Sequence, residues 1–219
     1  MSDVVIFGAG DYARIASVYL EKDSEHNVLA FAVDGKYKDR EELLGKPVLA
    51  FDDMRRSHPP DSVKLLVAIG FSGLNRGRTT VYERCKELGY QFITYVNSRA
   101  YQWGHVEIGE NTFIFEANVL QPFVRIGNNC VLWSGNHIGH DSTIDDHCFI
   151  SSHVVISGHC QIGHSCFIGV NATFRDGVHV APRCLIGAGA TILKDTEEGE
   201  VYGVRRTEPR DVKSWDIDF

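Results

Sequence analysis

The sequence predicts a small α/β domain with a Rossmann-like parallel sheet at residues 1–100, followed by an all-β domain at residues 101–219 that forms a parallel β-helix of about five coils with a C-terminal tail. Two observations predict this fold. Apolar runs that end in glycine alternate with helical patterns in the first half, and a six-residue period replaces them in the second half.

The first half reads as alternating strands and helices. Residues 4–7 are an apolar run that ends in a glycine-rich turn, and Ile15, Val18 and Tyr19 then recur at helical spacing. Further strands are expected at residues 28–33 and 64–69, and a helix at residues 78–88, which Gly89 ends. This alternation is typical of a doubly wound parallel sheet.

In the second half, every sixth residue is bulky and apolar over fifteen consecutive hexads. These residues are Ile108, Ile114, Leu120, Ile126, Leu132, Ile138, Ile144, Ile150, Ile156, Ile162, Ile168, Phe174, Val180, Ile186 and Ile192. The fifth residue of each hexad is small or medium-sized, and on a short strand it points to the same side as the apolar residue two places later. A fixed short period of this kind predicts a solenoid.

Five of the six cysteines occupy that small inward position: Cys130, Cys148, Cys160, Cys166 and Cys184. No two cysteines form a C-x-x-C pair, so the spacing does not favour a redox motif or a zinc site. We interpret these thiols as small core residues.

Three corners per coil give eighteen residues, so residues eighteen apart stack on one face. One outward column is apolar and a second is polar. The apolar column holds Phe113, Val131, Phe149, Phe167 and Leu185, and the polar column holds Arg125, Thr143, Gln161, His179 and Glu197. An exposed apolar column is unfavourable in water, so we expect a second subunit to cover it.

Hexads that open with Ile-Gly, such as Ile126-Gly127, Ile138-Gly139 and Ile186-Gly187, resemble those of the hexapeptide acyltransferases. The order of an α/β domain before five coils is similar to the nucleotide-sugar N-acetyltransferases of the bacillosamine-pathway and sialic-acid O-acetyltransferase group. This resemblance implies a left-handed β-helix, a homotrimer, acetyl-CoA as co-substrate and an amino group on a nucleotide-linked amino-deoxy sugar as acceptor. The setting would be surface polysaccharide or glycan synthesis.

The segment His140-Asp141-Ser142-Thr143-Ile144-Asp145 resembles the family's catalytic H-[DE]-x-x-I-G segment, with Asp145 in place of the usual glycine. The resemblance assigns His140 as general base and Asp141 as the carboxylate that orients it. An imidazole suits this role because it titrates near neutrality. His137 and His140 also suggest a metal pair, but their positions in the hexad point in different directions and we expect no metal.

The resemblance also implies residues that contact acetyl-CoA, namely Gly158, Ser151, Ala188 and Lys194. Gly158 follows His140 by eighteen residues and therefore lies on the same corner one coil later. It has no side chain to block a thioester, and its N–H is the expected oxyanion donor.

The glycine-rich turn before the first helix is suited to phosphate oxygens, although it lacks the third glycine of the dinucleotide motif. Together with the ends of the following strands, it gives a predicted nucleotide-sugar site. The expected residues are Gly8, Gly10, Asp11, Asp34, Gly70 and Asn75. A purely structural sheet is the alternative interpretation.

A net charge of −7 argues against a nucleic-acid surface, and no apolar run is long enough to span a membrane. We therefore expect a cytoplasmic protein. Two alternatives remain open: O-acetylation of a sugar such as sialic acid, and a β-helix that serves as a scaffold or a metal enzyme of the carbonic-anhydrase kind.

Overall fold

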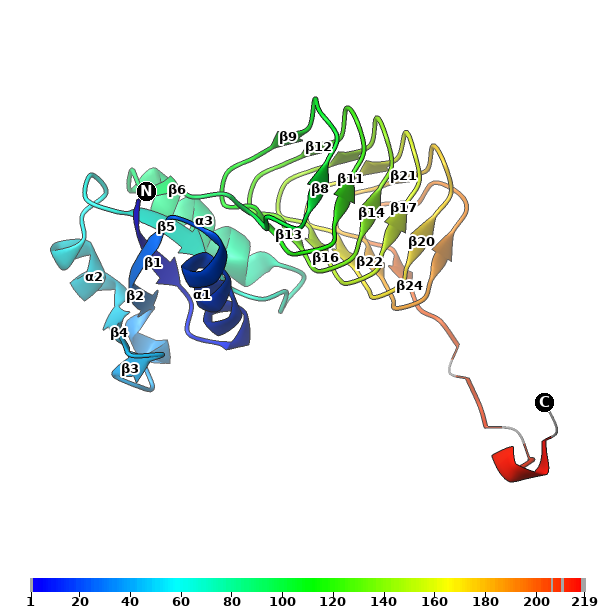
Figure 1. Ribbon diagram of the computed structural model, residues 1–219, viewed down its shortest axis with the longest axis horizontal. Helices are drawn as coiled ribbons and strands as arrows, with labels where there is room; N and C mark the ends of the chain where they lie inside the picture. Colours follow the sequence, from blue (N-terminus) through cyan, green and yellow to red (C-terminus); the bar gives the residue numbers. More distant parts are fainter. Residues whose placement is uncertain (1, 206, 210, 218–219) are drawn as a thin grey trace.

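The computed structural model describes residues 2–205, 207–209 and 211–217. An N-terminal α/β domain lies beside a long solenoid, and the C-terminal tail runs away from the last coil (Figure 1). Among the described residues, no helix combines the length and the apolar character that crossing a membrane requires.

The N-terminal sheet has six strands in the order β3-β4-β2-β1-β5-β6. The strands are β1 (Asp3–Phe7), β2 (Asn27–Val33), β3 (Glu42–Leu43), β4 (Lys46–Ala50), β5 (Lys64–Val67) and β6 (Gln91–Phe92). All pair in parallel except β3 with β4. The helices are α1 (Asp11–Asp23), α2 (Phe51–Ser57) and α3 (Arg76–Glu87), with a short 3₁₀ turn at Gly35–Tyr37.

The predicted strands and helices of this domain are confirmed, with β5 ending two residues earlier and α3 starting two residues earlier than expected. Four elements were missed: β3, β4, β6 and α2. The α2 helix has only seven residues, and the two-residue β3 is too short to carry a period.

The solenoid is a three-sided prism whose strands stack in three parallel sheets. Sheet I contains β7 (Tyr95–Val96), β10 (Phe113–Ile114), β13 (Val131–Leu132), β16 (Phe149–Ile150), β19 (Phe167–Ile168), β22 (Leu185–Ile186) and β24 (Val201–Tyr202). Sheet II contains β8 (Tyr101–Gln102), β11 (Val119–Leu120), β14 (His137–Ile138), β17 (Val155–Ile156), β20 (Thr173–Phe174) and β23 (Thr191–Ile192). Sheet III contains β9 (Glu107–Ile108), β12 (Arg125–Ile126), β15 (Thr143–Ile144), β18 (Gln161–Ile162) and β21 (His179–Val180).

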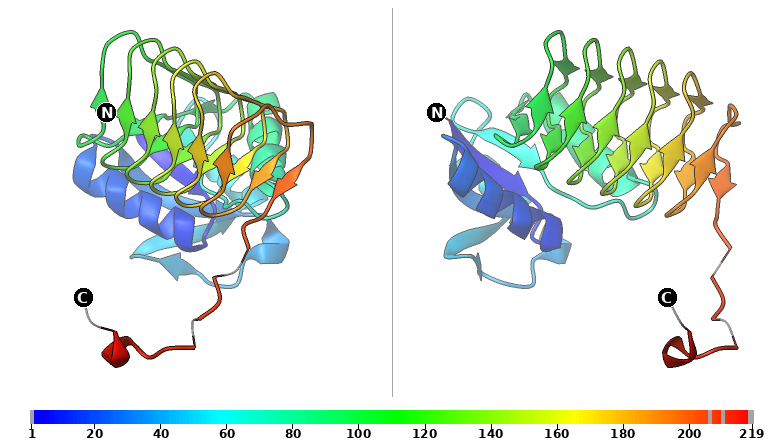
Figure 2. Two further views of the ribbon diagram at one scale, coloured as in Figure 1. Left: turned by 90° about the vertical axis from the view of Figure 1, so that its right-hand side faces the viewer. Right: turned by 45° about the vertical axis from the view of Figure 1, so that its right-hand side comes forward.

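The coils stack in one row, with the N-terminal domain beside the first of them (Figure 2). From β7 to β23, strand partners are eighteen residues apart, as in the pairing of Phe113 with Val131 and of Val131 with Phe149, whereas Leu185 pairs with Val201 sixteen residues on. The predicted hexad register is therefore confirmed. Solenoid pairing begins one coil earlier, where Tyr95 pairs with Phe113.

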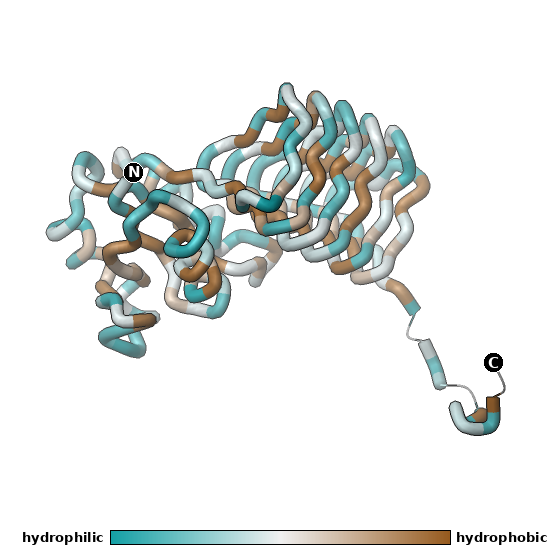
Figure 3. Tube along the Cα trace, viewed as in Figure 1, coloured by the Kyte–Doolittle hydropathy of each residue, from teal (hydrophilic) through white to brown (hydrophobic). Residues whose placement is uncertain are grey.

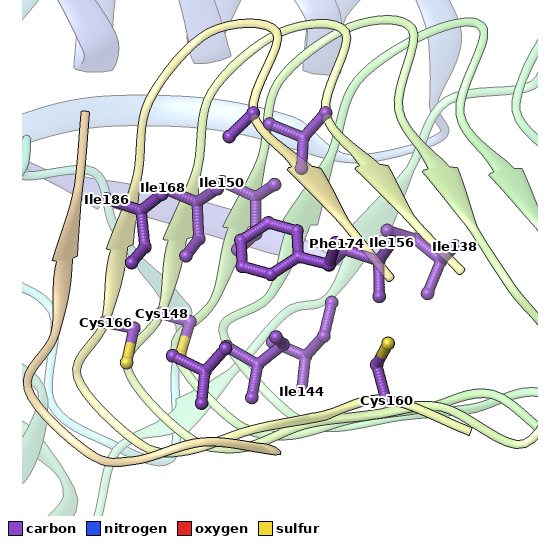
Figure 4. Packing of buried hydrophobic residues seen from close by; sticks show 14 of the residues in the cluster. Ile138, Ile144, Cys148, Ile150, Ile156, Cys160, Cys166, Ile168, Phe174 and Ile186 are labelled. Carbon is purple, nitrogen blue, oxygen red and sulfur yellow. The ribbon is translucent and has the colours of Figure 1, made fainter. Parts of the chain in front are cut away.

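The solenoid interior is mainly apolar, and its few buried polar side chains are hydrogen-bonded: Thr112, Asn118, Asn136 and Ser142. The isoleucine ladders point inward from all three sheets, and hydrophobic positions recur regularly along the coils (Figure 3). Cys148, Cys160 and Cys166 point into the same core (Figure 4). All six cysteines are free and buried, so the core interpretation of the thiols is confirmed.

The apolar column on sheet I exists, but the expectation that a second subunit covers it is wrong for Phe113, Val131 and Phe149, while Leu185 at its far end is 36% exposed. Phe113, Val131 and Phe149 are at most 4% exposed because the N-terminal domain of the same chain packs on them. Tyr12 and Tyr19 of α1 make edge contacts with Phe113 at 5.9 and 6.4 Å between ring centres. The sequence pattern identified a face that must be covered, and it contained no information on which part of the chain covers it.

Polar contacts hold the two domains together beneath this aromatic layer. The side-chain oxygen of Asn111, in the solenoid, accepts a hydrogen bond from the backbone N–H of Val67, at the end of β5, at 2.7 Å. Arg78 of α3 is fully buried and donates to the carbonyl oxygens of Asn129, His147 and Cys148, at 3.2, 2.9 and 3.3 Å. Charge-assisted bonds to buried carbonyls fix the orientation of the domains.

Candidate functional site

The glycine-rich turn between β1 and α1 is held tightly against β5. Gly8 has a φ of +136°, and a Cβ there would lie 2.5 Å from the carbonyl oxygen of Ala68, so only glycine fits. Gly10 is the N-cap of α1, and a Cβ added to it would meet no atom within 4 Å. No side chain caps the start of α1, so its first N–H groups and the helix dipole favour an anion there.

This turn forms one wall of a cavity of about 730 Å³ between the two domains. Five of the six residues predicted for a nucleotide line it: Gly8, Gly10, Asp11, Asp34 and Gly70. Sequence reasoning missed its aromatic wall, which includes Tyr37, Phe71, Trp133 and Phe149. Trp133 and Phe149 belong to the solenoid, so nothing in the sequence near the glycine-rich turn identifies them.

Asn75 lies outside the cavity. Its side chain is fully buried and donates to the Ser165 and Cys166 carbonyl oxygens at 3.3 and 3.1 Å. It also accepts a bond from Arg78 at 3.1 Å. Asn75 therefore fastens the start of α3 to the solenoid, and in this structure it has no free group for a ligand.

A cation that was not predicted from sequence shares the cavity with Asp34. Arg84 Nη2 lies 2.7 Å from Asp34 Oδ1, in ionic contact without hydrogen-bond geometry. The guanidinium also covers the Phe51 ring at 4.4 Å. Lys36 adds a second positive charge to the lining. The cavity thus combines cations and a helix N-terminus, which suit phosphates, with aromatic rings that suit a base.

His140 lies on the edge where sheet II turns into sheet III, called here the II–III edge. Its Nδ1 is 2.9 Å from Asp141 Oδ2. The carboxylate accepts from Nδ1–H, which fixes the tautomer and leaves Nε2 with a free lone pair. The backbone N–H of His140 donates to Gln121 Oε1 at 2.9 Å. The side chains of His140 and Asp141 are about half exposed, so a substrate can reach the imidazole ring.

Gly158 lies directly beside the free nitrogen. A Cβ on Gly158 would be 2.8 Å from His140 Nε2, which shows that the imidazole faces the backbone of the next coil. The neighbouring N–H groups on the edge are used, since His159 N donates to the His140 carbonyl at 2.9 Å. Among the described residues the Gly158 N–H has no acceptor. A base and an unused donor therefore lie side by side.

His159 completes a small cluster on this edge. Its ring meets that of His140 edge-on, 4.8 Å between centres. Ligand atoms of His140, Asp141 and His159 all lie within 4.8 Å of one another, and all three residues are exposed. This is the group of described residues with the spacing to approach a metal ion, and His137, the other half of the pair considered from sequence, is not part of it.

The residues expected to contact acetyl-CoA divide between two edges of the prism. Gly158 and Lys194 follow His140 at eighteen-residue steps on the II–III edge. Ser151 and Ala188 follow β16 and β22, on the edge where sheet I turns into sheet II. Within one chain these two pairs line different edges.

The interdomain cavity and His140 also lie on different sides of the solenoid. The cavity uses Trp133 and Phe149 at the sheet I side of the solenoid, whereas His140 lies on the II–III edge, opposite sheet I in a three-sided prism. A shallower groove of about 870 Å³ runs along sheet III and includes Arg125, Asp146 and His147. It contains neither the glycine-rich turn nor His140.

Comparison with known proteins agrees with this architecture. The family described as bacterial transferase hexapeptide (six repeats) matches residues 105–140, 123–158 and 159–194. No curated protein sequence matches the chain. The solenoid therefore carries the repeats of this family, and its fold is the left-handed parallel β-helix that the resemblance implied. Such a helix is an exception to the right-handed rule for parallel crossovers.

Several solved structures share the whole fold. The acetyltransferase domain of PglB from Neisseria gonorrhoeae has a TM-score of 0.79 at 21% identity, covering 92% of this chain and 96% of its own. PerB from Caulobacter crescentus, solved with CoA and GDP-perosamine, has a TM-score of 0.79 at 22% identity, covering 93% of each chain. WeeI from Acinetobacter baumannii gives 0.56 at 20% identity, covering 87% and 96%.

Proposed function

Because residues 105–194 carry bacterial transferase hexapeptide repeats, we propose that this protein is a cytoplasmic acetyltransferase that uses acetyl-CoA. Its acceptor is the amino group of a nucleotide-linked amino-deoxy sugar used for surface glycans. The observation that supports this most is the pairing of an oriented His140 with the unused N–H of Gly158 on one edge. The resemblance in fold to PerB, which was solved with CoA and GDP-perosamine, agrees with it.

The chemistry follows from this geometry. The acceptor nitrogen attacks the thioester carbonyl while His140 Nε2 removes its proton, and the Gly158 N–H donates to the oxyanion that develops. When the intermediate collapses, the C–S bond breaks and the imidazolium returns the proton to the CoA thiolate. Asp141 stabilises the imidazolium through Nδ1 at 2.9 Å.

The nucleotide part of the substrate fits the interdomain cavity. Its phosphates would lie at the N-terminus of α1 near Lys36 and Arg84, and its base against the aromatic wall. Gly8, Gly10, Asp11, Asp34 and Gly70 are the proposed contacts. Asn75 is excluded from this set because its amide is used between the domains.

One chain cannot bring its own cavity to its own His140, so we place the complete site between two chains. In a trimer of parallel solenoids, the II–III edge of one chain can face the N-terminal domain of the next. The two groups of CoA residues can then meet as well, with Gly158 and Lys194 from one chain and Ser151 and Ala188 from its neighbour.

The surface near His140 supports this assembly. Tyr101, Trp103 and Phe123, on sheet II and the II–III edge, are 59, 53 and 54% exposed. Sheet III is polar, with Arg125, Gln161 and His179 facing water. Exposed aromatic groups beside a functional edge favour burial against another copy. The proposed contact surface is therefore this aromatic group, and not the column on sheet I.

The direct test of the function is release of the CoA thiol from acetyl-CoA in the presence of amino-sugar nucleotides, GDP-perosamine among them. We expect sugar-dependent release and one added acetyl group by mass spectrometry. Turnover of a hydroxyl acceptor such as sialic acid in place of every amine would favour O-acetylation. Stoichiometric zinc in the purified protein, with no thiol release, would favour a metal enzyme at His140, Asp141 and His159.

Replacing Gly10 with Asp should weaken nucleotide binding selectively. The added side chain has open space, the backbone φ of −86° suits any residue, and Asp is a favourable N-cap, so the fold is preserved. Its negative charge then repels phosphates at the helix start. We expect the KM for the sugar nucleotide to rise at least about 10-fold, because a like-charge contact in a partly enclosed site costs more than about 1.4 kcal/mol.

Gly203→Asp is the matched control, since a Cβ there also meets no atom within 4 Å and the residue lies at the far end of the solenoid. The KM for acetyl-CoA should stay near the wild-type value in both variants. Equal changes in the two KM values, or no change for the sugar nucleotide, would rule out the α1 N-terminus as the phosphate site.

A further inference from the structure

A carboxylate that the proposed chemistry does not use faces the catalytic edge. Asp176 follows Gly158 by eighteen residues and lies on the same edge one coil later. A Cβ on Gly158 would be 3.1 Å from Asp176 Oδ2 and 2.8 Å from His140 Nε2. The space above Gly158 is therefore bounded by an imidazole nitrogen on one side and a carboxylate oxygen on the other.

This carboxylate is free to bind a ligand. Asp176 is exposed and has neither an ion-pair nor a hydrogen-bond partner among the described residues. Its neighbour Arg175 forms no ion pair with it in the described structure, and Lys194, one coil further on, forms none either. By contrast, Asp141 on the same edge is committed to His140 Nδ1 at 2.9 Å.

We propose that Asp176 binds the acceptor in its cationic ammonium form and so selects amines over hydroxyl groups. This rests on the proposed acetyl transfer at His140. A sugar amine flanked by electron-withdrawing oxygens resembles an α-amino group, which titrates near pH 8, so it is mostly protonated at neutral pH. An ammonium group above Gly158 donates to Asp176 Oδ2 and reaches His140 Nε2 at the same time. A sugar hydroxyl offers one proton and no charge, and gains little from the carboxylate.

The proton balance agrees with this arrangement. The bound ammonium first gives one proton to His140 Nε2, from which it passes to water. The free amine then attacks the thioester, and its second proton moves through the same nitrogen to the leaving thiolate. Asp176 keeps its charge throughout and acts by binding, so it determines specificity and is not itself a base.

The other titratable groups around this space are His140, Asp141 and His159, with Arg175 and Lys194 at its margin. None of these except Asp141 carries a negative charge, and Asp141 lies on the Nδ1 side of the imidazole. Asp176 is therefore the carboxylate placed on the Nε2 side, where the acceptor must enter.

The test compares the wild type with Asp176→Asn, using GDP-perosamine and its hydroxyl counterpart GDP-rhamnose as probes. We expect Asp176→Asn to lower kcat/KM for GDP-perosamine at least about 10-fold at pH 7, the effect of losing a charge-assisted bond. The loss should appear mainly in KM. It should shrink at pH 9, where the amine is neutral, and the low rate with GDP-rhamnose should be unchanged.

Asp176→Glu should recover part of the affinity because it restores the charge. Asp145→Asn, which removes the same charge from an exposed position on another edge, is the control and should behave as the wild type. The role of Asp176 would be overturned if kcat/KM of Asp176→Asn for GDP-perosamine fell equally at pH 7 and pH 9. It would also be overturned if kcat/KM did not fall at all while the wild type was fully active. A wild type that releases no thiol with any amino-sugar nucleotide would overturn the proposed function itself, and this inference with it.

Discussion

Replacing His140 with Asn is expected to lower kcat by at least about 10²-fold, since a positioned general base contributes about 10²- to 10⁴-fold. The side chain is about half exposed and buries no apolar surface in the core, so the fold should survive. The KM for the sugar nucleotide should change little, because the interdomain cavity and Asp176 remain to bind the substrate. Steady-state thiol release, with circular dichroism to verify folding, measures this.

His164→Asn is the matched control, because His164 is also exposed and holds the same third position of its hexad. It should retain wild-type turnover. Asp141→Asn should cost less than the loss of His140, since the imidazole remains and only its orientation is weakened. Near-normal turnover in the His140 variant would remove this residue from the mechanism.

Replacing Arg78 with Met is expected to lower the free energy of unfolding by about 3–5 kcal/mol. The guanidinium is fully buried and makes bonds to the carbonyl oxygens of Asn129, Gly70, His147 and Cys148. Methionine fills much of the volume but leaves the Asn129, Gly70 and His147 carbonyls without donors, each at a cost of about 1–3 kcal/mol before relaxation, whereas Cys148 still accepts from the Val131 N–H. Since Gly70 lines the cavity, nucleotide affinity should fall as well.

Urea unfolding measures the loss, and Arg76→Met is the control. Arg76 is two residues away on α3, is exposed and donates only to the Gly73 carbonyl at 2.9 Å. Its replacement should change stability by less than about 0.5 kcal/mol. An Arg78→Met protein as stable as the Arg76 variant would show that the buried network does not hold the domains together.

The solenoid was predictable almost residue by residue, whereas the contact between domains was not. A six-residue period repeated from Ile108 to Ile192 fixes strand, corner and stacking partner at once, because each coil repeats the same local geometry. For the same reason the sequence alone places His140 and Gly158 on one edge.

The interdomain residues carry no such period. Arg78 and Asn75 look like ordinary polar residues at the start of a helix, and only the docked solenoid makes them buried. The same docking turned the column of Phe113, Val131 and Phe149 from an expected subunit contact into an internal one. It also brought Trp133 into the interdomain cavity. A sequence pattern can therefore reveal an apolar face. Which part of the molecule covers that face depends on contacts between residues that are far apart in the sequence.

Mixed oligomers test whether one chain supplies the cavity for the nucleotide and another supplies His140. His140→Asn lacks the base but keeps the cavity, and Gly10→Asp keeps the base but repels the nucleotide. The measurement is acetyl transfer by the two variants co-expressed and co-purified, at a sugar-nucleotide concentration where each alone is nearly inactive. A site shared between chains predicts that activity returns to a substantial fraction of the wild-type value, because some sites combine an intact cavity with an intact His140. Mixed oligomers that stay as inactive as the separate variants would contradict it.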